Sequence, residues 1–130
     1  MDKIWLSHYQ EHVPHEININ EYASLVALIE SSCTQFGPKT AYVNMNSRLS
    51  FDELNTKSLS FAIYLQQLGL KKGDRVAIML PNVLQYPVVL FGILRAGCIA
   101  VNMNPLYTAP EIIHQQSGYD CTLGHKRVLC

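Results

Sequence analysis

A histidine and glutamate pattern near the start of the chain has the spacing of a zinc-hydrolase motif. Residues 8–12 read HYQEH, in which His8, Glu11 and His12 match HxxEH. In that motif two histidines on one helical face bind zinc while the glutamate activates a water molecule. Here Pro14 follows closely and disfavours helical geometry for the residue before it. We therefore interpret the segment as a surface arm that binds no metal tightly.

The four cysteines raise two further questions of chemistry. Cys121, His125 and Cys130 could supply metal ligands, but the second CxxC or HxxxH half of a structural zinc site is missing from the sequence. Cys33 and Cys98 lie in apolar stretches, where a free cysteine usually packs as a small hydrophobic residue. Core packing is thus preferred to a nucleophilic role. The opening residues lack the apolar run of a signal peptide, so free thiols in a reducing cytoplasm are expected.

The sequence contains no recognisable phosphate-binding motif. None of the seven glycines belongs to a GxxxxGK or GxGxxG segment. Lys71 and Lys72 could contact coenzyme A or a lipid head group, but two lysines in a turn before a glycine are typical of solvated surface. Ten Lys and Arg residues balance ten Asp and Glu residues, so no basic field favours nucleic acid. The residues alone assign no catalytic, cofactor-binding or metal-binding side chain.

The helices and strands of the chain must position any functional side chains. The first twenty residues have no sustained period and are predicted to form an irregular arm, packed on the domain through Trp5 and Tyr9. Asn20 can cap a helix that ends at Gly37, with apolar residues at helical spacing at Tyr22, Leu25, Val26, Ile29, Cys33 and Phe36. Residues 40–45 and 48–50 then predict two short strands joined by a tight turn.

A second helix is predicted by its capping signals. Ser50 and Glu53 form a capping box, and Leu49 and Leu54 form the accompanying hydrophobic staple. Gly69 stands where a left-handed residue would end the helix. One apolar stripe joins these two ends through Leu54, Ser58, Phe61, Ala62, Leu65 and Leu68.

The next segment predicts a strand, a helix and a strand. Residues 75–80 (RVAIML) and 98–103 (CIAVNM) are apolar without alternation, as strands covered on both faces are. An almost entirely apolar helical stretch through Phe91 to Arg95 separates them. The apolar run at residues 87–94 is less than half of the roughly 20 residues that span a bilayer, so we interpret it as a crossover helix. The fold class is α/β, with a right-handed βαβ unit and parallel strands.

The end of the chain loses these regular patterns. Thr108 and Glu111 form another capping box and predict the start of a helix. Residues 117–130 have neither helical nor strand period, and we expect a divergent, mobile tail that arose by a frame change or rearrangement.

Three blocks of the sequence closely resemble the start of bacterial long-chain fatty acid–CoA ligases. They read AYVNMNSRLSFDEL, YLQQLGLKKGDRVAIMLPNVLQYPVVLFGILRAG and VNMNPLYT. Val13-Pro14 and Glu16-Ile17 also match the family's opening segment, so the resemblance covers roughly residues 1–116. It implies an incomplete N-terminal part of the adenylate-forming enzyme fold, with residues 1–116 as a partial AMP-binding domain.

The resemblance also implies a reaction and its partners. Members of this family use ATP and magnesium to convert a fatty acid to an acyl-adenylate, and then transfer the acyl group to coenzyme A. They are cytoplasmic, and the full-length enzymes can be peripheral to the inner membrane. The family's phosphate loop, adenine-binding segment, magnesium-linked Thr-Glu, ribose-binding Asp and catalytic Lys all lie beyond the matched stretch. No site residue is carried over, and the chain alone is predicted to be inactive.

Two departures from the family pattern lie near the end of the match. Residues 107–111 read Tyr-Thr-Ala-Pro-Glu where the family usually has Tyr-Thr-Pro-Arg-Glu, a shift that the first turn of a helix tolerates. After His114-Gln115 the resemblance stops. A truncated ligase is our main hypothesis. The alternative is a non-enzymatic interaction module or complementing fragment that pairs or self-associates through exposed sheet edges, and marginal stability is expected in either case.

Overall fold

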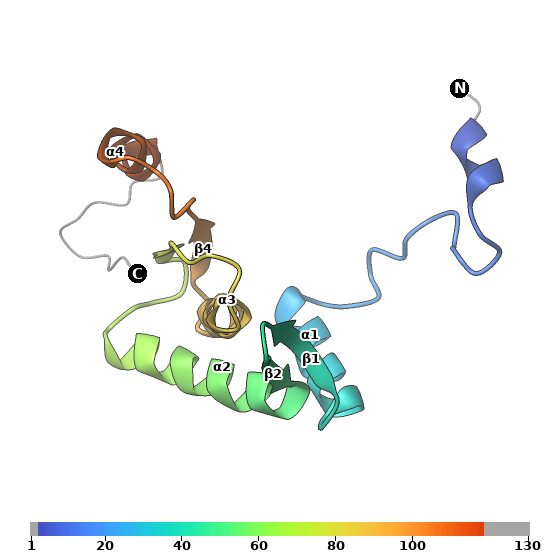
Figure 1. Cartoon of the computed structure of the whole chain (residues 1–130), viewed down its shortest axis with the longest axis horizontal. Coiled ribbons are helices and arrows are strands. Elements are labelled where there is room, and N and C mark those ends of the chain that lie inside the picture. The colour runs from blue at the N-terminus through green and yellow to red at the C-terminus, as the bar shows by residue number, and fades with distance from the viewer. Residues whose placement is uncertain (1–2, 119–130) are drawn as a thin grey trace.

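Two small sheets and the helices packed against them form the body of the protein. The computed structural model describes residues 3–118. Its elements follow one another along the chain as shown in Figure 1: η1 (Ile4–His8), α1 (Leu25–Phe36), β1 (Thr40–Asn44), β2 (Ser47–Ser50), α2 (Phe51–Gln67), β3 (Arg75–Ile78), α3 (Gln85–Arg95), β4 (Ile99–Asn102) and α4 (Ala109–Gly118).

The predicted βαβ unit is confirmed. β3 and β4 pair in parallel, from Arg75 opposite Ile99 to Ile78 opposite Asn102, and α3 is the helix that connects them. The core beneath this unit is apolar, as continuous apolar strands require. It contains Ala62, Leu65, Val76, Ile78, Ile93, Ala96 and Cys98. The α/β class and the parallel strands follow from these observations.

The predicted hairpin is also present. β1 and β2 pair antiparallel, and Met45 in the turn between them has a positive φ of 50°. The second strand begins at Ser47, one residue earlier than predicted. The hairpin packs on α1 and the start of α2 through a second cluster, made of Ile29, Cys33, Leu49 and Leu54.

The capping box that begins α2 is confirmed at both of its bonds. The Glu53 N–H donates to Ser50 Oγ at 3.1 Å, and the Ser50 N–H donates to Glu53 Oε2 at 3.0 Å. Leu49 and Leu54, the predicted staple, are buried in the same cluster. The two side chains of the box satisfy N–H groups that the helix itself leaves unpaired.

Removal of this cap should weaken the fold measurably. We expect Ser50→Ala to lower the free energy of unfolding by about 1 kcal/mol, the usual effect of losing a serine N-cap. Urea denaturation followed by circular dichroism measures the change. Ser60→Ala is the matched control, because Ser60 lies within the same helix and its hydroxyl bonds only to the Thr56 carbonyl. An equal loss in both variants would contradict the assignment of the cap.

The same capping box makes the free energy of unfolding depend on pH in the acidic range. The pKa of Glu53 is lowered, first by the hydrogen bond from the Ser50 backbone and then by Lys57. The folded state therefore releases this proton more readily than the unfolded state, in which the pKa of a glutamate is about 4.3. The contribution is complete well above that value and is lost as the pH falls toward the lowered pKa. Glu53→Gln should flatten the decline of stability in acid.

The structure corrects the start of the first helix. α1 begins at Leu25 with Ser24 as its N-cap, because the Ala27 N–H donates to Ser24 Oγ at 3.1 Å. The predicted cap, Asn20, lies outside the helix and bonds through its own N–H to Asn18 Oδ1. Both residue types cap helices well, so the sequence could not choose between them.

The prediction that the N-terminal arm packs on the domain is wrong. Figure 1 shows residues 3–23 leading away from the helices and sheets. Trp5 and Tyr9, the predicted anchors, are 50% and 42% exposed. The arm makes local contacts instead, because its turns bring His15 against the Tyr9 ring and Glu16 within 3.3 Å of the Lys3 ammonium.

The predicted helix near the end of the chain is confirmed and is longer than expected. The Thr108 N–H donates to Glu111 Oε2 at 2.7 Å, which supplies one bond of the capping box. α4 continues through Gly118, so the predicted boundary at residue 116 falls inside the helix. The predictions made for residues 119–130, including Cys121, His125 and Cys130, lie outside the described residues.

Candidate functional site

Polar side chains meet where the two parallel strands end. In α/β proteins, ligands usually bind at the carboxyl ends of such strands. Asn102 is the last residue of β4, and its side-chain oxygen accepts a hydrogen bond from the Tyr86 hydroxyl of α3 at 3.1 Å. Gln115 of α4 donates to the Asn102 carbonyl at 3.0 Å. The Tyr86 and Gln115 side chains thus meet at Asn102, one at its side chain and the other at its backbone carbonyl, in a hydrogen-bonded network without a formal charge.

A shallow cleft lies next to Tyr86, between β1 and the segment that precedes α3. Its volume is about 200 Å³, and its lining includes Tyr42, Asn44, Asn82 and Tyr86. The Asn44 side-chain amide donates to the Asn82 carbonyl across this cleft. Ligand pockets are usually about 300–1,000 Å³, so this one is small.

The chemistry available at this edge of the sheet is limited. Amide and phenol groups can hydrogen-bond a neutral polar group and fix its orientation. None of the residues that line the cleft carries a formal charge, and the network beside it is neutral as well. The site therefore has no cation to bind a triphosphate and no carboxylate to hold a magnesium ion.

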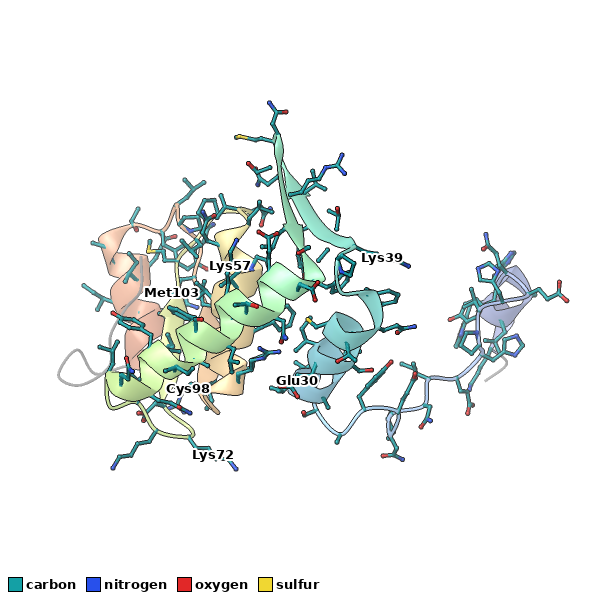
Figure 2. All side chains as sticks on the ribbon, turned by 90° about the horizontal axis from the view of Figure 1, so that it is seen from below. Glu30, Lys39, Lys57, Lys72, Cys98 and Met103 are labelled. Atoms are coloured by element: carbon teal, nitrogen blue, oxygen red, sulfur yellow. The ribbon has the colours of Figure 1, made fainter. Side chains whose placement is uncertain are left out.

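Lys71 and Lys72 belong to the turn before β3. Both are exposed, and Figure 2 shows Lys72 at the loop, directed away from the helices. The Lys71 N–H donates to Asp74 Oδ2 at 2.8 Å, and the Gly73 N–H donates to the Gly97 carbonyl at 2.9 Å. The first bond closes the turn, and the second links it to the residue two positions before β4, so the role of the turn is structural.

The thiols of Cys33 and Cys98 lie in the core, as predicted. The two residues are 4% and 5% exposed. Burial raises the pKa of the Cys33 thiol and of the Cys98 thiol. Since the thiolate is the reactive form of cysteine, these environments disfavour a nucleophilic role.

The HxxEH segment does not form the helix that a zinc hydrolase needs. η1 ends at His8, so His8 and His12 do not share a helical face. Within residues 3–118, no group of three or more His, Cys, Asp and Glu side chains is placed to hold a metal ion. In the same part of the chain, no helix has the length and apolar character to cross a membrane.

The described residues form a mixed α/β unit built around one parallel strand pair and its crossover helix. Residues 29–123 match the family described as AMP-binding enzyme. This match includes more than half of the sequence, and the chain belongs to that family.

Comparison with individual proteins shows which members of the family the chain resembles. The chain is 58% identical over 116 residues to the long-chain-fatty-acid–CoA ligase of Salmonella typhimurium, an alignment that includes 88% of this chain and 21% of the relative. It is 51% identical over 118 residues to the ligase of the same name from Yersinia pestis, again with 21% of the relative. The chain thus spans about a fifth of the length of these proteins.

Solved structures agree with the fold. The N-terminal subdomain of Klebsiella oxytoca NpsA superimposes with a TM-score of 0.75 at 18% identity, over 82% of this chain and 29% of that one. A Mycobacterium tuberculosis fatty acyl CoA synthetase superimposes with a TM-score of 0.66 at 29% identity, over 71% of this chain and 19% of that one. The resemblance stated from the sequence is confirmed.

The sequence prediction missed the Tyr86, Asn102 and Gln115 network. One signal was present, because Asn102 is a polar residue directly after the buried Val101 of β4. Polar residues at such strand ends are typical of α/β binding sites.

Proposed function

We propose that the chain is a segment of a long-chain fatty acid–CoA ligase that cannot carry out ligation alone. The observation that carries this proposal is the 58% identity over 88% of the chain, combined with coverage of only 21% of the relative. Residues 1–116 would belong to a partial AMP-binding domain that continues at least to the end of α4 at Gly118, and a divergent tail would follow it. Fatty acid, ATP, magnesium and coenzyme A would be substrates and cofactors of the longer protein. Its location would be cytoplasmic, with peripheral contact to the inner membrane.

The described residues support inactivity of the isolated chain. The network at the carboxyl ends of β3 and β4 is uncharged, and the cleft beside it is about 200 Å³. Acyl-adenylate formation develops negative charge on phosphate oxygens, which enzymes stabilise with cations and positioned N–H donors. Such cations are missing from this network and from the cleft lining.

We therefore expect no ATP-dependent acyl-CoA formation by the purified chain. The assay supplies a long-chain fatty acid, ATP, magnesium and coenzyme A, and the chain is produced in a host without its own ligase. The Salmonella typhimurium ligase is the positive control. Turnover by the chain would contradict the proposal of inactivity.

A chimera tests whether the segment is ligase-like in function. Residues 1–116 of this chain replace the matching segment of the Salmonella typhimurium ligase. We expect the chimera to keep acyl-CoA formation, because the segment is 58% identical. A folded but inactive chimera would contradict the proposal that this chain is a competent ligase segment.

A further inference from the structure

The turn of the β1–β2 hairpin holds a methionine in a strained backbone conformation. Asn44 pairs with Ser47, so Met45 and Asn46 form the turn. Met45 has a φ of 50°, and within residues 3–118 it is the one residue other than glycine with a positive φ. Residues with positive φ in such turns are usually glycine, asparagine or aspartate, because a Cβ is crowded against the backbone there. The hairpin therefore keeps a large apolar side chain where the turn favours a small or polar one.

Burial does not compensate for this strain. Met45 is 95% exposed, the highest value of any large apolar side chain in the part of the chain that the structure describes. In Figure 2 the hairpin, which begins beside the labelled Lys39, extends away from the helices. Strained residues cluster at positions where the protein binds or reacts, so Met45 is a candidate contact residue.

The side chains next to the turn combine apolar surface with positive charge. Val43 and Arg48 lie directly opposite each other in the two strands and therefore share one face of the hairpin. Val43 is 63% exposed, and Arg48 is exposed as well. Arg48 is the only charged residue between 40 and 50, and Lys39 precedes the hairpin. The next acidic residue along the chain, Asp52, lies in α2, beyond the end of the hairpin that is far from the turn.

A membrane surface fits this tip better than another protein does. Stable protein interfaces bury about 800 Å² on each partner, which the apex of one hairpin cannot supply. A lipid surface needs no matching groove, because it accepts single apolar side chains at the boundary between head groups and acyl chains. Anionic lipids also attract cationic residues close to that boundary. The long arginine stem keeps the guanidinium among the head groups while its apolar neighbours go deeper.

We propose that the tip of the β1–β2 hairpin contacts an anionic phospholipid surface, with Met45 and Val43 inserted and Arg48 paired with a lipid phosphate. The inference rests on the proposed function, whose peripheral membrane contact it assigns to named residues. Insertion is shallow, because Asn46 and Ser47 beside Met45 are polar. The contact is therefore reversible, and it weakens as salt screens the arginine.

Vesicle sedimentation with the full chain tests the proposal. One set of vesicles contains equal parts of phosphatidylglycerol and phosphatidylcholine, and the other contains phosphatidylcholine alone. We expect binding to the mixed vesicles that is about fivefold tighter than binding to phosphatidylcholine, the usual effect of one cation near an anionic surface. Equal binding to both sets overturns the proposal. So does no binding of the chain to the mixed vesicles, and the tip would then serve a protein contact.

Two substitutions of Met45 test the apex. Met45→Gly and Met45→Asn both suit a positive φ, and both remove the apolar side chain. Each should weaken binding to the mixed vesicles about tenfold, while the midpoint of thermal unfolding stays the same or rises. A purely structural role of Met45 would instead lower that midpoint. Parent-like binding of both variants overturns the proposal.

Two further variants show whether the effect belongs to the hairpin. Arg48→Gln should weaken binding to the mixed vesicles about fivefold and leave binding to phosphatidylcholine unchanged. Leu106→Gln is the matched control, because Leu106 is 86% exposed but lies in the segment between β4 and α4. It should bind like the parent. A loss for Leu106→Gln as large as for Met45→Gly would show that exposed apolar residues adhere without selectivity, and would overturn the assignment to the hairpin.

The chimera separates failure of this inference from failure of the proposed function. An active chimera, together with a chain that does not bind the mixed vesicles, overturns the inference and leaves the proposed function intact. A folded inactive chimera contradicts the proposed function. In that case, vesicle binding by the full chain and its loss in Met45→Gly still decide whether the hairpin makes the contact.

Discussion

Gly92→Ala is expected to destabilise the protein by about 1–3 kcal/mol, the usual cost of forcing extra atoms into a packed core. A loss of stability is unusual for this substitution, because alanine within a helix normally stabilises it by about 0.5–1 kcal/mol relative to glycine. Gly92 lies within α3 and is buried. The contact between α2 and α3 explains why the ordinary gain is reversed.

The two helices lie close together at this glycine. A Cβ at position 92 would lie 2.7 Å from Phe61 Cδ1 and 2.9 Å from the Ser58 carbonyl oxygen. The phenylalanine ring can move, but the carbonyl belongs to the backbone of α2 and cannot. Ser58 is itself small and 0% exposed, so both helices have small residues at the crossing.

Urea denaturation of the parent and of Gly92→Ala measures the effect. Adding Phe61→Leu to Gly92→Ala should recover part of the loss, because it relieves the ring contact and leaves the contact with the Ser58 carbonyl. A higher midpoint for Gly92→Ala than for the parent would show that the helices do not pack as described.

Local signals in the sequence were sufficient to predict most of the elements. Ser50 and Glu53 bond to groups three residues away, so their capping box could be predicted without tertiary structure. The continuous apolar runs correctly predicted the parallel pairing of β3 and β4. The predicted burial on both faces is confirmed for β3 and is wrong for β4, because Ile99 is 46% exposed.

Features that depend on distant contacts could not be predicted in this way. The helical pattern through α3 showed an apolar helix, but the role of Gly92 depends on where α2 crosses it. The arm was expected to pack because it contains Trp5 and Tyr9, yet their aromatic character does not specify a surface to cover.

The contacts of the candidate site could not be predicted from local sequence patterns either. Tyr86 and Gln115 lie 16 and 13 positions from Asn102, and only the crossover and the next helix bring the three together. The sequence suggested no such network, whereas the resemblance of the quoted blocks correctly predicted the family. Family membership was therefore easier to predict than the contacts within the site.

The second large effect is expected at Arg95, the last residue of α3. Its side chain is 4% exposed and lies between α1 and α2. Nη1 donates to the Asn55 carbonyl at 3.0 Å, and Nη2 donates to Asn55 Oδ1 at 2.6 Å. Nη2 also lies 3.8 Å from Glu30 Oε1, whose side chain is 58% exposed.

The bonds to Asn55 should matter more than the ion pair with Glu30. Hydrogen bonds from a charged group contribute about 1.5–3 kcal/mol, whereas exposed ion pairs contribute about 0–1 kcal/mol. The aliphatic part of the arginine is buried too, so its truncation loses packing. We therefore expect Arg95→Ala to lower the free energy of unfolding by about 2–3 kcal/mol.

Two matched variants separate these contributions. Glu30→Gln keeps the shape of the side chain and removes its charge, so it should change stability by less than about 0.5 kcal/mol. Arg95→Met keeps most of the buried stem without the guanidinium bonds, and should recover about half of the loss caused by Arg95→Ala. Chemical denaturation of the three variants gives the comparison. A loss for Glu30→Gln as large as for Arg95→Ala would show that the ion pair dominates, and parent-like stability of Arg95→Ala would show that this buried arginine does not hold the three helices together.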